Sequence, residues 1–250
     1  VSPIQPNVVY AVIEKAAGKG GFYRSADRGE SWTRMSDYTA GGTGPHYYHE
    51  LYADPHQMDW VYSADVMLQV TRDGGKTVVD VGEEWKHVDN HAVAFHPLDP
   101  DYLLVGCDGG LYETWDKGKN WKYIANLPVT QFYKVSLDND LPFYNMVGGT
   151  QDNSTQYGPS QTPTRNGIRN SDWQIIWGGD GHGPAMDKVD ADFVYVQSQQ
   201  ANLGRWDRGS GEGASIVAVP GEEEDPLRPN WDAPILVSPH SHTRLYHGFQ

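Results

Sequence analysis

Residues 114–121 read TWDKGKNW, in which a threonine, an aspartate, a glycine and a tryptophan are regularly spaced. Similar stretches occur at residues 25–32 (SADRGESW) and 71–78 (TRDGGKTV). The shared pattern is S/T-x-D-x-G-x-x-W, with Val78 replacing the tryptophan in the second copy. The aspartate can accept hydrogen bonds from its own backbone, and the glycine can take a positive φ. The pattern therefore predicts a tight turn between two antiparallel strands.

Six short β-rich segments also recur, each after a turn containing Pro, Asp or Asn. They are spaced 40 to 52 positions apart, a period typical of propeller blades. In the third copy, runs at 91–97, 102–106, 111–115 and 121–127 predict four antiparallel strands joined by tight turns. The anchor residues of the repeat are Tyr10, Tyr62, Leu104, Tyr144, Tyr195 and Tyr246.

These two markers predict an all-β chain, a β-propeller of four-stranded antiparallel blades. Residues 1–250 would form a single propeller segment of about five blade equivalents, with each Asp–Gly turn joining the third and fourth strands of a blade. A structural role is expected for the turn residues, which are Ser25, Asp27, Gly29, Trp32, Asp73, Gly75, Asp116, Gly118 and Trp121. Each tryptophan would pack against neighbouring structure.

SADRGESW and TWDKGKNW resemble the Asp-box (BNR) repeats of sialidases, sortilin-type receptor domains and xyloglucan-cleaving glycosidases. The stretch from HVDNHAVAFHPLDPDYLLVGCDGG through GGTQDNST and GGDGHG to NWDAPILVSPH is similar to large secreted bacterial proteins with sortilin-like or glycosidase-like propellers. The resemblance implies Asp-box hairpins in a larger ring, commonly of seven or about ten blades, so we expect a fragment of a larger protein. It does not select a function, because enzymes, receptors and assembly factors share the repeat.

The composition excludes several classes of protein. With 19 Lys and Arg against 33 Asp and Glu, the net charge is −14, which argues against nucleic acid and against anionic membrane surfaces. No apolar run approaches the roughly 20 residues of a membrane span. A single cysteine, Cys107, excludes a disulfide framework. The resemblance implies a secreted, periplasmic or cell-surface protein, and no signal peptide is present in this segment.

The predicted strand order sorts the loops onto two ends of each sheet. The Asp–Gly turns and the turns between first and second strands share one end, which we call the turn end. Connections between sheets and turns between second and third strands share the other, which we call the loop end, and propellers commonly bind ligands there. Ligand-binding residues predicted at the loop end are Tyr47, His49, His91, Gln151, Asp152, Asn153, His182 and Trp231, with Tyr48 and Trp177 as further stacking faces.

Two chemical hypotheses attach to the loop end. A glycoside hydrolase needs two carboxyls, about 6.5–9.5 Å apart for inversion or about 5–5.5 Å for retention, and the candidates are Asp65, Asp89, Asp108, Asp152 and Asp180. On an extended strand, alternate residues share a face, so His87, Asp89 and His91 could bind a divalent metal; polar lining of a channel is the alternative. No other cofactor is expected.

Three functions stay open from the sequence. The first is a propeller that binds a saccharide or a peptide at the loop end. The second is a glycoside hydrolase that uses a pair of the aspartates, acting on a polysaccharide. The third is a structural or assembly module of a larger secreted protein, with further blades or modules as its partners. The sialidase activity is not expected, because the loop end lacks the arginines that would grip a substrate carboxylate.

Overall fold

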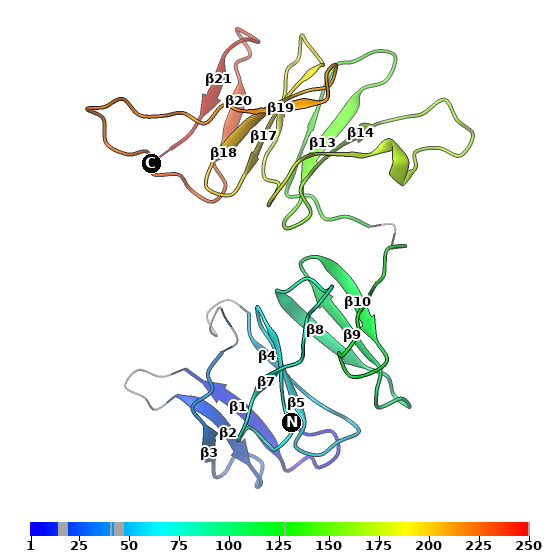
Figure 1. The fold of residues 1–250 in the computed structure, drawn as a ribbon, viewed down its shortest axis with the longest axis vertical. Coiled ribbons are helices and arrows are strands. Elements are labelled where there is room, and N and C mark those ends of the chain that lie inside the picture. Colours follow the sequence, from blue (N-terminus) through cyan, green and yellow to red (C-terminus); the bar gives the residue numbers. More distant parts are fainter. Residues whose placement is uncertain (15–19, 41, 43–47, 128, 250) are drawn as a thin grey trace. The chain divides into compact units, whose positions relative to one another are not determined.

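The computed structural model describes residues 1–14, 20–40, 42, 48–127 and 129–249. It divides into two compact units, Val1–Leu127 and Pro128–Gln250. Each unit consists of antiparallel sheets in which every strand pairs with its neighbour in sequence (Figure 1). The only helix described is a 3-10 turn at Asn170–Asp172, so no helix in the described part of the chain could span a membrane.

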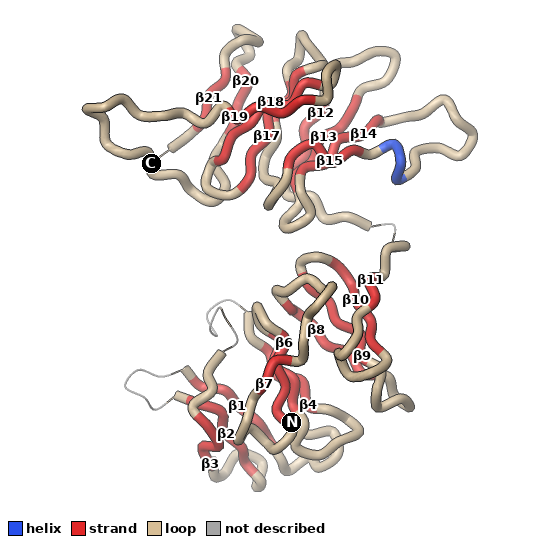
Figure 2. Tube along the Cα trace, viewed as in Figure 1, coloured by secondary structure: helices blue, strands red, loops and turns tan. Residues whose placement is uncertain are grey.

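The first unit contains three sheets (Figure 2). The first has three strands: β1 (Val9–Ile13), β2 (Gly21–Ser25) and β3 (Thr33–Ser36). The second has four: β4 (Glu50–Ala53), β5 (Val61–Ala64), β6 (Leu68–Thr71) and β7 (Val79–Asp80). The third also has four: β8 (Asn90–Phe95), β9 (Leu103–Cys107), β10 (Gly110–Thr114) and β11 (Lys122–Tyr123).

The second unit repeats the arrangement. One four-stranded sheet comprises β12 (Lys134–Leu137), β13 (Asn145–Gly149), β14 (Thr155–Pro159) and β15 (Gln174–Trp177). The next comprises β16 (Ala185–Met186), β17 (Phe193–Ser198), β18 (Asn202–Asp207) and β19 (Glu212–Ser215). A pair, β20 (Ile235–Val237) and β21 (Leu245–His247), follows.

The predicted fold class is confirmed, because the chain is all-β and its complete sheets are four-stranded and antiparallel. The repeat anchors occupy equivalent strands: five lie within β1, β5, β9, β17 and β21, and Tyr144 directly precedes β13. In the third copy the four predicted strands correspond to β8–β11, although β11 is only two residues long. Membership in a single, larger propeller ring stays a prediction.

The three Asp–Gly turns share one hydrogen-bonding scheme. In the third turn the Thr114 hydroxyl donates to Asp116 Oδ1 (2.8 Å) and accepts from Gly118 N (3.0 Å). Asp116 also accepts from the backbone N of Asn120 (2.9 Å). The corresponding side chains in the other turns make the same bonds. The glycines have φ values of 88° to 97°, the left-handed region that favours glycine.

One backbone hydrogen bond recurs in five sheets and fixes the turn end. In the four-stranded sheets, an amide in the turn between the third and fourth strands donates to a carbonyl in the turn before the second strand. In the three-stranded first sheet the equivalent turns are the one between β2 and β3 and the one before β1. The pairs are Arg28 N to Asn7 O, Gly74 N to Asp59 O, Lys117 N to Asp101 O, Ser160 N to Tyr144 O and Arg208 N to Asp192 O, at 2.8 to 3.0 Å. Both kinds of turn therefore lie at the same end of each sheet.

Apolar cores fill the space between neighbouring sheets within each unit. Val61, Phe22 and Tyr10 belong to the core of the first two sheets, and Tyr62, Leu68 and Val105 to the core of the second and third. In the second unit, Met186, Val196 and Trp206 are buried between the sheets β12–β15 and β16–β19. These cores hold adjacent sheets together and so bring their loops side by side.

One expectation about the turn residues is corrected by the structure. Trp32 belongs to none of the apolar cores of the described residues: it is 41% exposed and its indole N donates to Gly29 O of its own turn. Trp121 behaves as expected, packing on the core of the second and third sheets and donating to Gly82 O. The glycine- and proline-rich segment that begins at Gln151 contributes to both ends of its sheet. Its first residues form the β13–β14 turn at the loop end, whereas residues 160–173 connect β14 to β15 at the turn end.

Candidate functional site

Side chains from three separate connections and from strand β8 meet at the loop end of the second and third sheets. Tyr48 lies before β4, Asp89 precedes β8, and Asp108 is in the β9–β10 turn. The Tyr48 hydroxyl donates to Asp89 Oδ1 (2.8 Å), and the Tyr48 and His91 rings are 4.3 Å apart. His91 Nε2 lies 2.7 Å from Asp108 Oδ1. Residues far apart in the sequence thus form one polar cluster.

Burial and three neighbouring carboxylates all raise the pKa of the Tyr48 hydroxyl. Burial raises this pKa first, the hydrogen bond to Asp89 adds to the shift, and the negative charges of Asp89, Asp108 and Asp65 raise it further. Asp65, in the β5–β6 turn, is fully buried and its Oδ1 accepts from Val66 N (2.7 Å). Three of the predicted carboxylates therefore act on a single phenol.

His49 links the chain before β4 to strand β5 of the same sheet. Its Nε2 lies 2.7 Å from Ser63 Oγ, which also accepts the hydroxyl of Tyr38 (2.8 Å). Burial lowers the pKa of His49, although the negative charge of Asp65 opposes the shift. A neutral imidazole at this place can accept the Ser63 proton, so the chain Tyr38–Ser63–His49 is fully hydrogen-bonded.

The residues proposed for a metal site lie partly outside a strand. Strand β8 begins only at Asn90, and Asp89 has φ 61°, so the alternation of side chains assumed for residues 87–91 does not hold throughout. His87 Nδ1 nevertheless lies 3.9 Å from Asp89 Oδ2, and it also lies 2.8 Å from Val88 O. His91 is paired with Asp108. Binding of a metal by any of them stays a prediction.

The second unit carries its own polar cluster at the loop end of β12–β15. The β13–β14 turn, which holds Gln151, Asp152 and Asn153, docks on the loop after β15 through backbone groups. Asp152 N donates to the buried Asp180 (3.0 Å to Oδ1), and Ser154 N donates to Gly179 O (3.1 Å). Asp152 has φ 55°, a left-handed conformation in which aspartate is enriched but most other residues are rare.

His182 is as deeply buried in this cluster as Asp180. It is 3% exposed and stacks on Tyr133 with ring centroids 5.6 Å apart. Burial lowers its pKa, with opposing effects from the negative charges of Asp232 and Asp180. Its Nε2 is buried without a hydrogen-bond partner among the described residues. The Tyr133 hydroxyl bonds to Gln151 Oε1, which joins His182 to the β13–β14 turn.

An ion pair lies beside His182. Lys134, at the start of β12, contacts Asp232 Oδ2 (2.6 Å), and Gln197 on β17 donates to Asp232 Oδ1 (3.2 Å). The preceding residue, Trp231, is 52% exposed, and its carbonyl accepts from Gln200 N. Three neighbouring sheets of the unit thus contribute to one polar surface.

Most predicted residues lie in one of these two clusters, and some do not. Tyr47 lies outside the described residues. Trp177 is not a stacking face, because it packs on the core beside Gly204 and Gly213. Sequence reasoning missed Tyr133, Lys134 and Asp232, which carry no motif and are identified only by their contacts. It also missed Trp85. A tryptophan among charged residues, in GEEWKH at residues 82–87, could have drawn attention to it.

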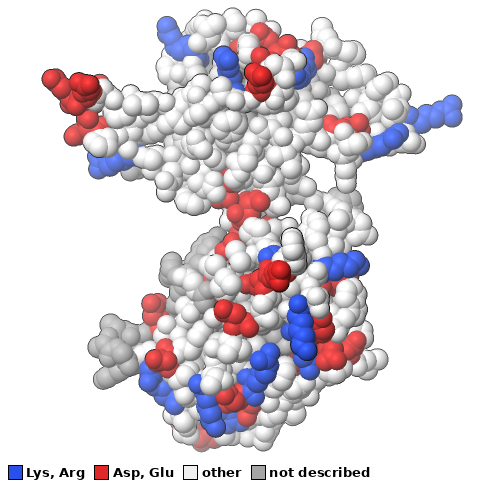
Figure 3. Space-filling model, in the orientation of Figure 1, with Lys and Arg blue, Asp and Glu red and all other residues white. Residues whose placement is uncertain are grey.

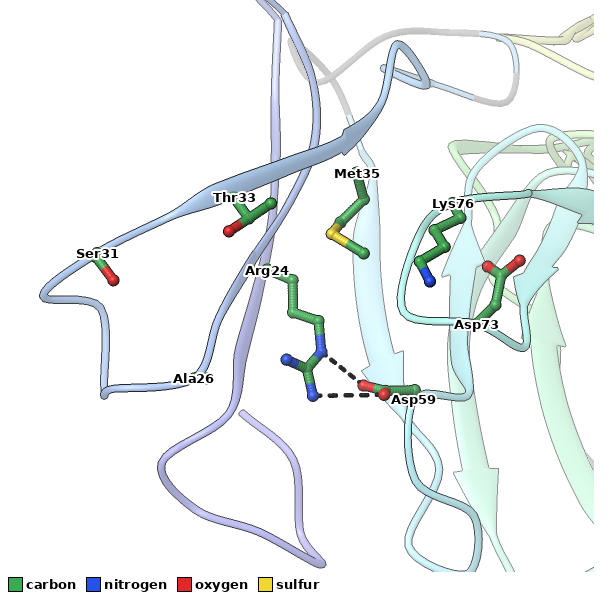
Figure 4. A pocket seen from close by; sticks show the side chains of 8 residues that line it. All are labelled: Arg24, Ala26, Ser31, Thr33, Met35, Asp59, Asp73 and Lys76. Carbon is green, nitrogen blue, oxygen red and sulfur yellow. Dashed lines mark hydrogen bonds and ion pairs between the residues drawn. The ribbon is translucent and has the colours of Figure 1, made fainter.

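Two cavities among the described residues lie elsewhere, at the turn end. One of about 390 Å³ is lined by Arg24, Met35, Asp59 and Lys76, among others. Figure 4 shows the Arg24 guanidinium pointing at the Asp59 carboxylate, and Arg24 Nε lies 2.7 Å from Asp59 Oδ1. Another, of about 340 Å³, lies around Arg208, which pairs with Asp140 and Asp192. The charged groups that line each cavity pair with each other. We therefore interpret both cavities as structural contacts between neighbouring sheets and not as binding sites.

The charges on the visible face of residues 1–127 are mixed. Figure 3 shows Lys and Arg side chains interspersed with Asp and Glu rather than gathered into one basic area. In that unit Arg24 pairs with Asp59, Lys117 with Asp101, and Lys122 with Glu113. This face offers no continuous basic surface for a polyanion.

No protein-family model matches the sequence, and no curated protein does. Among solved structures, a GH74 enzyme from Niastella koreensis has a TM-score of 0.44 at 14% identity, over 86% of this chain and 37% of that one. The GH74 xyloglucanase from Xanthomonas campestris has 0.41 at 19% identity, over 87% and 38%. A structure of YCF48 bound to D1 peptide has 0.35 at 14% identity, over 98% and 72%. The chain spans little more than a third of the two GH74 proteins.

Proposed function

We propose that the loop end binds a saccharide or a peptide outside the cytoplasm, as part of a larger protein of the Asp-box (BNR) type. The observation that carries the proposal is the cluster of Tyr48, Asp89, His91 and Asp108. Its members come from the chain before β4, the start of β8 and the β9–β10 turn, and are linked by contacts. Carboxylates, imidazoles and phenols side by side offer the acceptors and donors that hydroxyl or amide groups need.

The second unit supports the same proposal. A turn with Asp152 at positive φ is fastened to a second loop through backbone hydrogen bonds, which holds its side chains in place at a cost in backbone strain. Exposed Trp231 beside the Lys134–Asp232 pair adds an aromatic face to polar groups. Strained turns that present polar and aromatic side chains are common at binding sites.

The test compares two variants of the first unit, one that removes a negative charge at the loop end and one that removes a negative charge at the turn end. The complete chain is run in native gels containing soluble β-glucan, xyloglucan or galactomannan, and is probed on a peptide array. Asp108→Asn removes a carboxylate of the cluster, and Glu30→Gln removes an exposed carboxylate at the turn end. We expect Asp108→Asn to weaken binding about tenfold or more and Glu30→Gln to leave it unchanged. Equal effects of the two variants would contradict a site at the loop end.

Glycoside hydrolysis is the second candidate. The observation that favours it is that Asp89 bonds to Tyr48 and Asp108 bonds to His91, whose ring lies against that of Tyr48. A hydrolase needs two carboxyl groups near the bond that it cleaves. Incubation of the chain with the same polysaccharides should then release new reducing ends, and the Asp89→Asn variant should release none. Binding without new reducing ends would leave a binding protein and remove the hydrolase.

A further inference from the structure

Trp85 presents its indole to solvent without a structural reason to do so. It is 85% exposed, compared with 41% for Trp32, 53% for Trp115 and 52% for Trp231. Its ring makes no aromatic or cation–π contact with any other residue that the structure describes. An indole left in water contributes no burial to folding, so its place in the chain calls for another explanation.

The backbone at this residue is also unfavourable for tryptophan. Lys86 N donates to Glu83 O (3.1 Å), which closes a four-residue turn with Trp85 in its third position. Trp85 has φ 68°, the conformation in which glycine or asparagine is preferred and a bulky side chain is strained. A glycine here would satisfy the turn, yet the chain places its largest side chain there.

The turn that carries Trp85 is held in place from both sides. The side chains of Glu83 and Lys86 are 4% and 0% exposed and lie 2.7 Å apart. Glu83 Oε2 also accepts from Leu68 N (3.1 Å), and Glu83 Oε1 accepts from Asn90 Nδ2 (2.8 Å). These buried anchors do not involve the indole. The turn therefore presents Trp85 from a fixed base.

The same anchors place the turn at the loop end. Asn90 Nδ2 donates to Asp65 O (3.2 Å) and Val66 O (3.0 Å), and Asp89 N donates to Val66 O (2.8 Å). Trp85 and Asp89 thus belong to one connection, which is bound to the β5–β6 turn that contains Asp65. The indole and the carboxylate cluster are two parts of one loop end.

We propose that Trp85 is a stacking platform for a pyranose ring of a neutral saccharide bound at the loop end of residues 1–127. The C–H groups on the face of a pyranose pack on an aromatic ring, while the hydroxyls at its edge can donate to carboxylates of the kind gathered nearby. The abundance of carboxylates disfavours an anionic sugar. The inference rests on the proposed binding function and names its ligand class.

A protein partner fits these observations less well. Protein interfaces have a contiguous apolar centre, whereas Glu84, which directly precedes the indole in its turn, is charged and exposed. A single aromatic ring with charged neighbours is suited to one flat ring, so a saccharide is the occupant that we infer.

The test uses Trp85→Gly and Trp85→Phe in the complete chain, with soluble β-glucan, xyloglucan and galactomannan as probes. We expect Trp85→Gly to weaken binding about tenfold or more, and Trp85→Phe to stay within about threefold of the wild type because an aromatic ring remains. The melting temperature of Trp85→Gly should be equal or higher, since glycine accepts φ 68°. Trp115→Ala, which removes an exposed indole at the turn end, should bind like the wild type.

The outcomes separate this inference from the proposed function. If the wild type binds a polysaccharide and Trp85→Gly binds equally well, the stacking role is wrong and the binding function stands. The same holds if the wild type binds only peptides, or if Trp85→Gly lowers the melting temperature strongly and Trp85→Phe does not restore binding. If the wild type binds neither polysaccharides nor peptides, the proposed function itself is wrong.

Discussion

At the scale of single residues, backbone conformation decides which substitution is informative. Asp152 has φ 55°, so alanine there would add strain of about 1 kcal/mol to the loss of the carboxylate. Asparagine adopts this conformation readily and removes only the charge. The loss of affinity can therefore be separated from the loss of stability.

We predict that Asp152→Asn weakens ligand binding about tenfold or more with an unchanged melting temperature, and that Asp152→Ala weakens binding equally but also lowers the melting temperature. Gel retardation and thermal denaturation measure the two effects. Glu212→Gln, an exposed carboxylate at the turn end of the same unit, is the control and should change neither. Wild-type affinity of Asp152→Asn would remove this carboxylate from the site.

The buried imidazole of His182 predicts a dependence of stability on pH. Its pKa is lowered by burial in the folded chain, against about 6.5 in the unfolded chain. As the pH falls below about 7, the unfolded chain therefore binds a proton that the folded chain does not, and stability is lost. His49 and His247, whose pKa values burial also lowers, contribute in the same direction.

We expect the urea midpoint of the wild type to fall between pH 7.5 and pH 5.5, and His182→Phe to reduce this fall, because phenylalanine keeps the stack on Tyr133 without titrating. One such group contributes at most about 1.4 kcal/mol per pH unit. His240→Phe, at an exposed histidine, should retain the wild-type dependence. Identical pH profiles for His182→Phe and the wild type would contradict the prediction.

At the scale of elements, the Asp–Gly turns also join neighbouring sheets. A Cβ on Gly75 would lie 2.0 Å from Cδ1 of Phe22, a buried residue of the first sheet, and Gly75 has φ 97°. Gly82 has a similar φ of 99°, but a Cβ there would lie 3.8 Å from its nearest neighbour, Gly118 O. The two glycines share the backbone requirement and differ in packing.

We therefore predict that Gly75→Ala destabilises the chain by about 2–4 kcal/mol, from overlap with Phe22 added to backbone strain. Gly82→Ala should cost only about 1 kcal/mol, from the backbone. Urea denaturation followed by far-ultraviolet circular dichroism measures both. Equal costs would mean that the turn does not pack on the neighbouring sheet as the structure has it.

At the scale of the whole molecule, the two ends of the sheets divide stability from binding. The recurring backbone bond and the ion pairs of Arg24 and Arg208 occupy the turn end. The polar clusters, the Lys134–Asp232 pair and the exposed indoles of Trp85 and Trp231 occupy the loop end. Asp27 illustrates the first group: hydrogen bonds from Ser31 and Ser25 hold the pKa of its carboxyl at about 2.

The division predicts opposite effects of two alanine substitutions. Asp27→Ala should lower the melting temperature and leave the dissociation constant unchanged, because it removes acceptors from a turn. Trp231→Ala should weaken binding about tenfold and leave the melting temperature unchanged, because its side chain is half exposed. Calorimetry and gel retardation on the complete chain distinguish them. Loss of folding in both variants would contradict the division.

The local parts of this architecture could be predicted from the sequence. A turn of the Asp116–Gly118 kind forms from groups within eight residues, so its hydrogen bonds and its positive φ are encoded next to one another. Regular repetition then yields the strand order and the sorting of loops onto two ends. For this reason Asp89, His91, Asp152 and His182 could be assigned to the loop end without coordinates.

What only the tertiary structure decided is which of these side chains meet, and how. The Lys134–Asp232 pair joins residues 98 positions apart. Buried His182 stacks on Tyr133, 49 positions earlier in the chain, and Asp89 N donates to Val66 O of the preceding sheet. Local pattern is governed by hydrogen bonds within a few residues, which the sequence spells out. Contacts between sheets depend on the packing of whole cores, which no short stretch of the sequence contains.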